Sequence, residues 1–84
     1  MKKYLQLLGT AGCHLCDQAE TVLAEMLSNG VNWEIELIDI ADDDQLLESY
    51  GERIPVLRDV EAKRDLGWPF DVGTVQEFLK ADTR

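Results

Sequence analysis

The chain has 84 residues, 45% of them hydrophobic and 30% charged, which suits one domain over residues 1–84 and leaves no room for a second. Its 17 acidic residues outnumber its 8 basic residues and give a formal net charge of -9. This balance argues against a nucleic-acid partner and against an anionic membrane surface, because both are bound by basic surfaces.

The N-terminal half is predicted to form a strand, a helix and a second strand. Residues 4–8 are an apolar run typical of a buried strand, and the small residues 9–12 predict a turn. Residues 13–27 carry apolar side chains at steps of three and four, which predicts an amphipathic helix that Asn29 or Gly30 ends. In the second strand, over residues 31–40, one face is expected to hold Trp33, Ile35 and Leu37, and the other Glu34, Glu36 and Ile38.

The C-terminal half is predicted to form a short helix, a hairpin and a last helix. An acidic turn at residues 41–44 leads into a helix at 45–50, whose buried side is expected to hold Leu46, Leu47 and Tyr50 and which Gly51 ends. A proline opens a strand at 55–58, and residues 63–67 return antiparallel to it. Asp71 is placed to cap a last helix that carries Val72, Val75, Phe78 and Leu79.

The predicted fold is therefore α/β, in the order β-α-β-α-β-β-α. The first strand, helix and strand predict a parallel crossover pair, and the last two strands are joined closely enough to be antiparallel. We expect a mixed four-stranded sheet with helices on both faces.

The residues Cys13-His14-Leu15-Cys16 carry the one motif with evident chemistry. A Cys-x-x-Cys that follows a strand and opens a helix is typical of a redox dithiol. Free amides and the dipole at a helix start stabilise a thiolate, so Cys13 is the expected attacking thiol and Cys16 the resolving one. A protonated His14 imidazole would stabilise that thiolate further, whereas a His14 that is merely exposed to solvent would not.

Other interpretations of the two cysteines remain open. A purely structural disulfide is disfavoured, because a four-residue loop adds little stability. A zinc site would need four ligands, and His14 is the one further strong candidate; a cluster shared by two subunits is the remaining form of a metal site.

The first twelve residues also imitate a bacterial lipoprotein signal, but they are short and Gln6 interrupts the apolar run, so we expect a cytoplasmic protein.

Together these features resemble the glutaredoxin-like branch of the thioredoxin-fold superfamily, over essentially the whole chain. Cys13 to Cys16 match its dithiol motif, and Arg53-Ile54-Pro55-Val56-Leu57 is similar to the segment in which a proline opens the third strand. The resemblance implies that the Ile54–Pro55 bond is cis and lies beside the dithiol, and that the Ile54 backbone pairs with a bound substrate. It further implies substrate contacts from Gly12, His14 and Leu15.

One region departs from the family. Glutaredoxins hold glutathione with a Gly-Gly turn before the last helix; here Gly67 and Asp71 can retain that role, but Trp68-Pro69-Phe70 stands between them, as in bacterial glutaredoxin-like families. The basic residue that often precedes the motif is replaced by Thr10 and Ala11. Trp68 and Phe70 are read either as core packing or as an aromatic rim for a partner.

We therefore expect a monomeric thiol–disulfide oxidoreductase that acts on a disulfide-containing protein or a small thiol. No metal or resident cofactor is expected, and glutathione serves as co-substrate only if Gly67 and Asp71 bind it. Two alternatives stay open. One is a redox-silent binding or adaptor module on the same fold. The other is a dimer that carries a metal or an iron–sulfur cluster.

Overall fold

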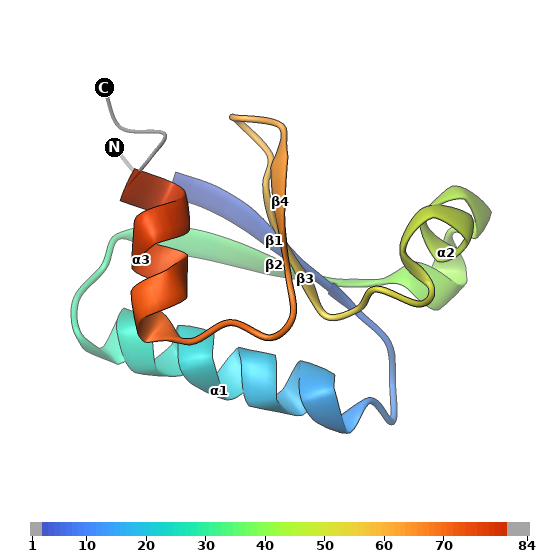
Figure 1. Ribbon diagram of the computed structural model, residues 1–84, viewed down its shortest axis with the longest axis horizontal. Helices are drawn as coiled ribbons and strands as arrows, with labels where there is room; N and C mark the ends of the chain where they lie inside the picture. Colours follow the sequence, from blue (N-terminus) through green and yellow to red (C-terminus); the bar gives the residue numbers. More distant parts are fainter. Residues whose placement is uncertain (1–2, 81–84) are drawn as a thin grey trace.

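The computed structural model describes residues 3–80, and over these residues the predicted order of elements is confirmed (Figure 1). The elements are β1 (Lys3–Gly9), α1 (His14–Ser28), β2 (Trp33–Asp39), the 3-10 helix η1 (Ile40–Asp42), α2 (Asp44–Tyr50), β3 (Val56–Asp59), β4 (Arg64–Gly67) and α3 (Val72–Lys80). Most observed boundaries lie within two residues of the predicted ones, and the acidic turn contains the extra 3-10 helix.

The four strands form one mixed sheet in the spatial order β2-β1-β3-β4. Strand β1 is parallel to β2 and antiparallel to β3, and β3 is antiparallel to β4. The register sets Leu5 of β1 opposite Ile35 of β2, and Leu8 opposite Ile38. This confirms the predicted mixed sheet and the two predicted faces of the second strand.

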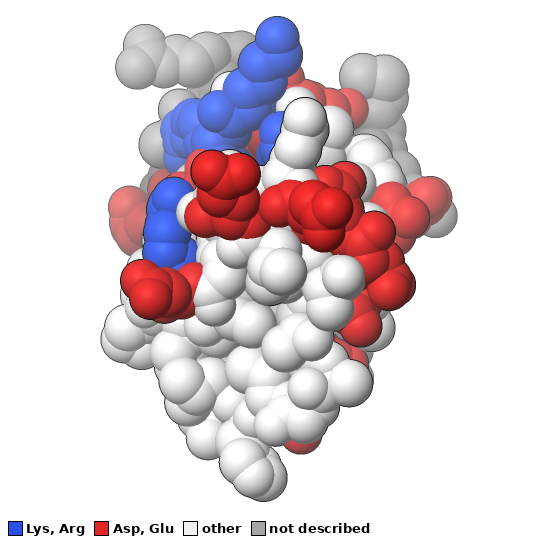
Figure 2. All heavy atoms as spheres, turned by 90° about the vertical axis from the view of Figure 1, so that its right-hand side faces the viewer, with Lys and Arg blue, Asp and Glu red and all other residues white. Residues whose placement is uncertain are grey.

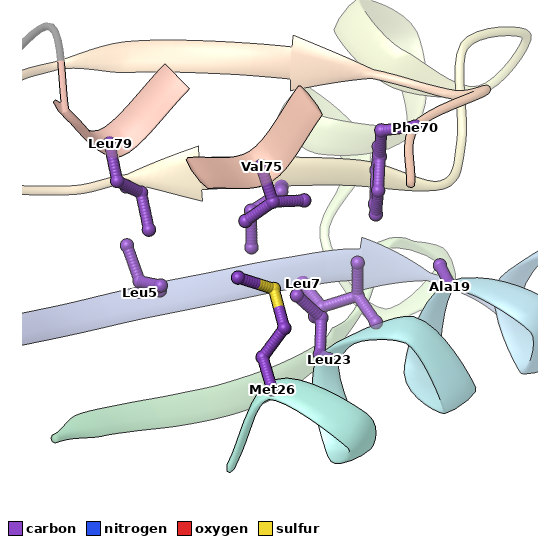
Figure 3. Close-up of a cluster of buried hydrophobic side chains, with 9 residues drawn as sticks. Leu5, Leu7, Ala19, Leu23, Met26, Phe70, Val75 and Leu79 are labelled. Atoms are coloured by element: carbon purple, nitrogen blue, oxygen red, sulfur yellow. The ribbon is translucent and has the colours of Figure 1, made fainter. Parts of the chain in front are cut away.

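The larger core lies on the face of the sheet that α1 and α3 cover (Figure 3). Strand β1 contributes Leu5 and Leu7, which are 0% and 3% exposed, because alternate residues of a strand point to the same face. The helices close this layer with buried side chains spaced three or four residues apart: Ala19, Leu23 and Met26 from α1, and Val75 and Leu79 from α3. Each large side chain buried here contributes about 1.5–3 kcal/mol to stability.

Helix α2 packs on the opposite face and forms a smaller core. There Leu8 and Val56 from the sheet meet Ile40, and Leu46 and Tyr50 pack against them. The prediction that Leu47 is also buried is wrong, since its side chain is 47% exposed. A two-turn helix buries one narrow strip, and Leu46 and Tyr50, four residues apart, fill it.

At the end of the sheet where β1 begins, a buried carboxylate shapes the β3–β4 hairpin. Asp59 is 0% exposed, and its Oδ1 accepts a hydrogen bond of 3.2 Å from the Ala62 amide in the turn. The Lys3 ammonium lies 2.9 Å from its other oxygen. No helix within residues 3–80 is long and apolar enough to cross a membrane.

Candidate active site

The two cysteines meet at the start of α1, where the sequence places them. Cys13 is the N-cap of α1, with extended backbone angles, and it forms a disulfide with Cys16 across a Cα–Cα distance of 5.2 Å. The Cys13 sulfur also accepts a hydrogen bond of 3.1 Å from the Cys16 amide. Cys13 is half-buried, whereas Cys16 is 5% exposed and belongs to the core. The outer sulfur is therefore the one that a large reactant reaches first, and a helix amide points at it.

The residues around Cys13 leave its sulfur at the surface. Gly12 has a φ of 78°, a conformation that favours glycine, and it turns the chain into the helix. His14 and Leu15 are the first two residues of α1, and both are exposed, Leu15 by 44%. These three predicted contact residues thus lie next to Cys13, on the outside of the molecule.

Gly9 belongs to this site, although the sequence did not single it out. A Cβ atom built on Gly9 would lie 2.9 Å from the Cys16 sulfur and 3.3 Å from the Cys16 Cβ. The last residue of β1 must therefore lack a side chain for α1 to bring Cys16 against the sheet. A glycine at the end of a strand just before a helical dithiol is the signal that could have indicated this contact.

Pro55 lies at the same end of the sheet as Gly9, on the side of β1 where β3 pairs. Leu8 pairs with Val56, so in the antiparallel register Pro55 comes level with Gly9. The Ile54–Pro55 peptide bond is cis, and so is the Trp68–Pro69 bond. Cys16, Gly9 and Pro55 therefore follow one another across this end of the sheet.

Part of the Gly67–Asp71 segment lies at this end of the sheet. Gly67 pairs with Val56, and the Trp68 amide donates a hydrogen bond of 3.1 Å to the Pro55 carbonyl, which holds the segment beside Pro55. Trp68 packs edge-on against Phe70, with ring centroids 5.0 Å apart, and Phe70 is buried in the core. The core interpretation of Phe70 is therefore confirmed.

Asp71 caps α3, as predicted. Its Oδ1 accepts hydrogen bonds of 2.8 Å from the Thr74 amide and 2.9 Å from the Thr74 hydroxyl. The Thr74 amide, followed by the Thr74 hydroxyl, lowers the pKa of the Asp71 carboxyl below its ordinary value. This carboxylate oxygen is thus engaged with its own helix.

Charge is unevenly distributed over the end of the molecule that carries α2 and the β1–α1 loop (Figure 2). An acidic band crosses this face at the level of α2, and a broad uncharged area lies below it, at the level of the β1–α1 loop. Across residues 3–80, no three histidine, cysteine or acidic side chains come together in a group that could hold a metal ion. The β1–α1 loop, which leads into the dithiol, thus lies at the level of the uncharged area, below the acidic band.

Solved structures of other proteins share this architecture. A comparison with curated proteins finds no match. A structural-genomics target protein from X. campestris has 40% sequence identity; its crystal structure gives a TM-score of 0.78 over 92% of this chain and 96% of that one. Its solution structure gives 0.75 over 92% of each chain. A protein from Nitrosomonas europaea, 26% identical, gives 0.78 over 93% of this chain and 92% of that one.

The family described as "Glutaredoxin-like domain (DUF836)" matches residues 4–80, nearly the whole chain. This match runs from the first strand to the end of α3 and so includes both cysteines and Pro55. The chain therefore belongs to the glutaredoxin-like domain family and has its thioredoxin-like fold.

Proposed function

We propose that the protein is a thiol–disulfide oxidoreductase that works through Cys13 and Cys16. The observation that supports this most is the contact at the N-cap, where the Cys16 amide donates to the Cys13 sulfur over 3.1 Å. In the reduced protein that amide and the positive end of the α1 dipole stabilise a thiolate on Cys13. A thiolate is the form of cysteine that attacks disulfides.

The exchange proceeds in two steps. The Cys13 thiolate attacks one sulfur of a substrate disulfide, the substrate S–S bond breaks, and the departing thiolate takes a proton from water. Cys16 then gives its proton to water and attacks the Cys13 sulfur of the mixed disulfide, which releases the second substrate thiolate to take up a proton from water. The substrate disulfide is reduced to two thiols, and the two protein cysteines are oxidised to the Cys13–Cys16 disulfide.

Burial separates the roles of the two sulfurs. Cys16 is 5% exposed and packs against Gly9, so it reaches only the sulfur of Cys13, once Cys13 has formed the mixed disulfide. Cys13 is half-buried at the surface and is open to a reactant. We therefore assign attack to Cys13 and resolution to Cys16, with Gly12, His14, Leu15, Ile54 and Pro55 forming the rim that a substrate contacts.

The substrate class that we propose is a disulfide in a protein or a small thiol, in a reducing compartment such as the cytoplasm. The Asp71 oxygen Oδ1 caps α3, so this carboxylate would share its charge between the cap and a glutathione amine. Thr10 and Ala11 supply no cation ahead of Cys13 for a glutathione carboxylate. Glutathione is accordingly a weaker candidate substrate than a protein disulfide.

The test is disulfide reduction by the purified protein, followed with a protein disulfide such as insulin and with dithiothreitol as the dithiol that reduces the Cys13–Cys16 disulfide after each exchange. Cys13→Ser should abolish turnover, since no attacking sulfur remains. Cys16→Ser should still attack but accumulate a mixed disulfide with the substrate, visible by mass spectrometry. Retained turnover in Cys13→Ser would contradict the assignment of the attacking sulfur.

A matched control separates loss of chemistry from loss of fold. Leu47→Ser changes an exposed side chain on α2, and we expect it to keep wild-type turnover. Alkylation of Cys13 over a range of pH should show a reactive thiolate well below the ordinary thiol pKa of about 8.5. A Cys13 that reacts no faster than a free thiol across neutral pH would favour a redox-silent adaptor.

A further inference from the structure

A groove runs along one edge of the sheet, between α1 and β2. Its first part, about 250 Å³ in volume, lies beside Cys16 and the ends of β1 and β2. Its second part, about 210 Å³, lies between apolar side chains of α1 and β2. Leu7, Glu20 and Leu37 line both parts, so the two join into one groove that leads toward the dithiol.

The groove exposes large apolar side chains next to a strand with a free edge. Leu37 of β2 is 59% exposed and Leu27 of α1 is 41% exposed, although the helical pattern places Leu27 among the apolar positions. Within residues 3–80, β2 is one of the two edge strands of the sheet and pairs with β1 alone. An apolar groove beside an unpaired strand edge is the arrangement to which an extended segment adds as a further strand.

Charge decides what kind of segment fits. The stretch from residue 4 to residue 52, which includes α1, β2 and α2, contains no lysine or arginine. It contains eleven acidic residues: Asp17, Glu20, Glu25, Glu34, Glu36, Asp39, Asp42, Asp43, Asp44, Glu48 and Glu52. A second copy of the chain would bring the same negative charges to this edge and be repelled, whereas a basic segment would be attracted.

Apolar and acidic side chains alternate along β2, and this alternation indicates which residues of a bound segment would face which side of the sheet. Ile35 and Leu37 face the groove on the α1 side, while Glu34 and Glu36 lie on the other face of the sheet. A strand added beside β2 presents its own alternate residues to the same two faces. Its apolar residues would then enter the groove, and its basic residues would meet the two glutamates.

We propose that this groove binds an extended segment of a partner protein in which lysine or arginine alternates with apolar residues. The site lies on the β2 side of β1, whereas Pro55 lies on the β3 side. Docking at the groove therefore leaves Cys13 and the Pro55 rim free, and it does not depend on the thiol chemistry. Its role is to hold a partner at the end of the molecule where disulfide exchange takes place.

The probe is a synthetic peptide in which lysine and valine alternate, titrated into the oxidised full-length protein and followed by amide NMR. We expect saturable shifts at the amides of β2 and at α1, and weaker binding as salt is raised, because the attraction is between opposite charges. The same peptide with glutamate in place of lysine should cause no shifts. The absence of any shift at millimolar lysine peptide would overturn the proposal.

Two matched leucine variants locate the site. Leu37→Ser removes the exposed apolar side chain of the groove and should weaken binding about tenfold, the expected loss for uncovering one such side chain. Leu47→Ser removes a similarly exposed leucine on α2 and should bind as the parent does. Equal affinity in both variants, shifts confined to the Pro55 side, or a free protein that dimerises through β2 would each refute the proposal. Cys13→Ser should bind unchanged, which separates this proposal from the proposed enzymatic function.

Discussion

Replacing Gly9 by alanine tests the close packing of Cys16 against the sheet. The added methyl group would stand 2.9 Å from the Cys16 sulfur and 3.3 Å from its Cβ, well inside normal contact distance. Overpacking a tight site costs about 1–3 kcal/mol. The lower flexibility of alanine in the unfolded chain returns about 0.5–1 kcal/mol. We expect a net loss of about 0–2.5 kcal/mol, centred near 1 kcal/mol, and a melting temperature lower by roughly 4–8 °C for each kcal/mol.

The assay is urea unfolding of the reduced protein, run as a double-mutant cycle with Cys16→Ala. That second substitution keeps the Cβ contact and removes the sulfur, so the cost of Gly9→Ala should fall by about 1 kcal/mol in its background. Gly73→Ala is the matched control: its Cβ would meet Asp71 at an ordinary 3.5 Å, inside α3, and should add about 0.5–1 kcal/mol of stability. A Gly9→Ala cost that is equal in both backgrounds would disprove the contact.

Three further outcomes are expected. Asp71→Asn should be less stable than the parent above about pH 4, and this difference should shrink as the pH falls further and vanish once Asp71 is protonated in the folded protein too, because the pKa of Asp71 is lowered in the folded protein. A hydrogen bond to a carboxylate on β4 raises the pKa of Tyr50. The parent should therefore lose stability as the pH rises above about 10, and Tyr50→Phe should not show this loss when unfolding is measured at alkaline pH. Lys3→Met should cost about 3 kcal/mol in urea unfolding, since it leaves the carboxylate of Asp59 buried without its ion pair; a neutral effect would show that the pair adds nothing.

The elements were predictable because each follows from local chemistry. The apolar steps of three and four identify α1, alternation separates the two faces of β2, and Asp71 stands directly before the helix that it caps. The dithiol was predictable for the same reason, since Cys13 and Cys16 are one helical turn apart. These features depend on neighbours in the chain, which the sequence displays directly.

What the sequence did not indicate depends on contacts between distant residues. Gly9 and Cys16 meet because α1 folds back onto β1, and the position of this glycine at the end of a strand does not by itself show which distant residue it contacts. The exposure of Leu47 depends on how narrow a strip of α2 meets the sheet. Likewise, the groove beside β2 exists because no further strand covers that edge in the part of the chain that the structure describes.

The separation of charge along the chain also has a kinetic consequence. All eight basic residues lie within residues 2–3 and 53–84, so residues 4–52 contain acidic residues but no lysine or arginine. Residues 53–84 carry six basic and six acidic residues, whose charges cancel, so the net negative charge comes from residues 4–52. The body is 33 Å long, several times the screening distance of about 8 Å in physiological salt, so a visitor near α1, β2 or α2 is attracted mainly by the acidic residues of these elements. Such a molecule has a dipole moment that turns it during diffusional approach and raises the frequency of productive encounters with cationic proteins.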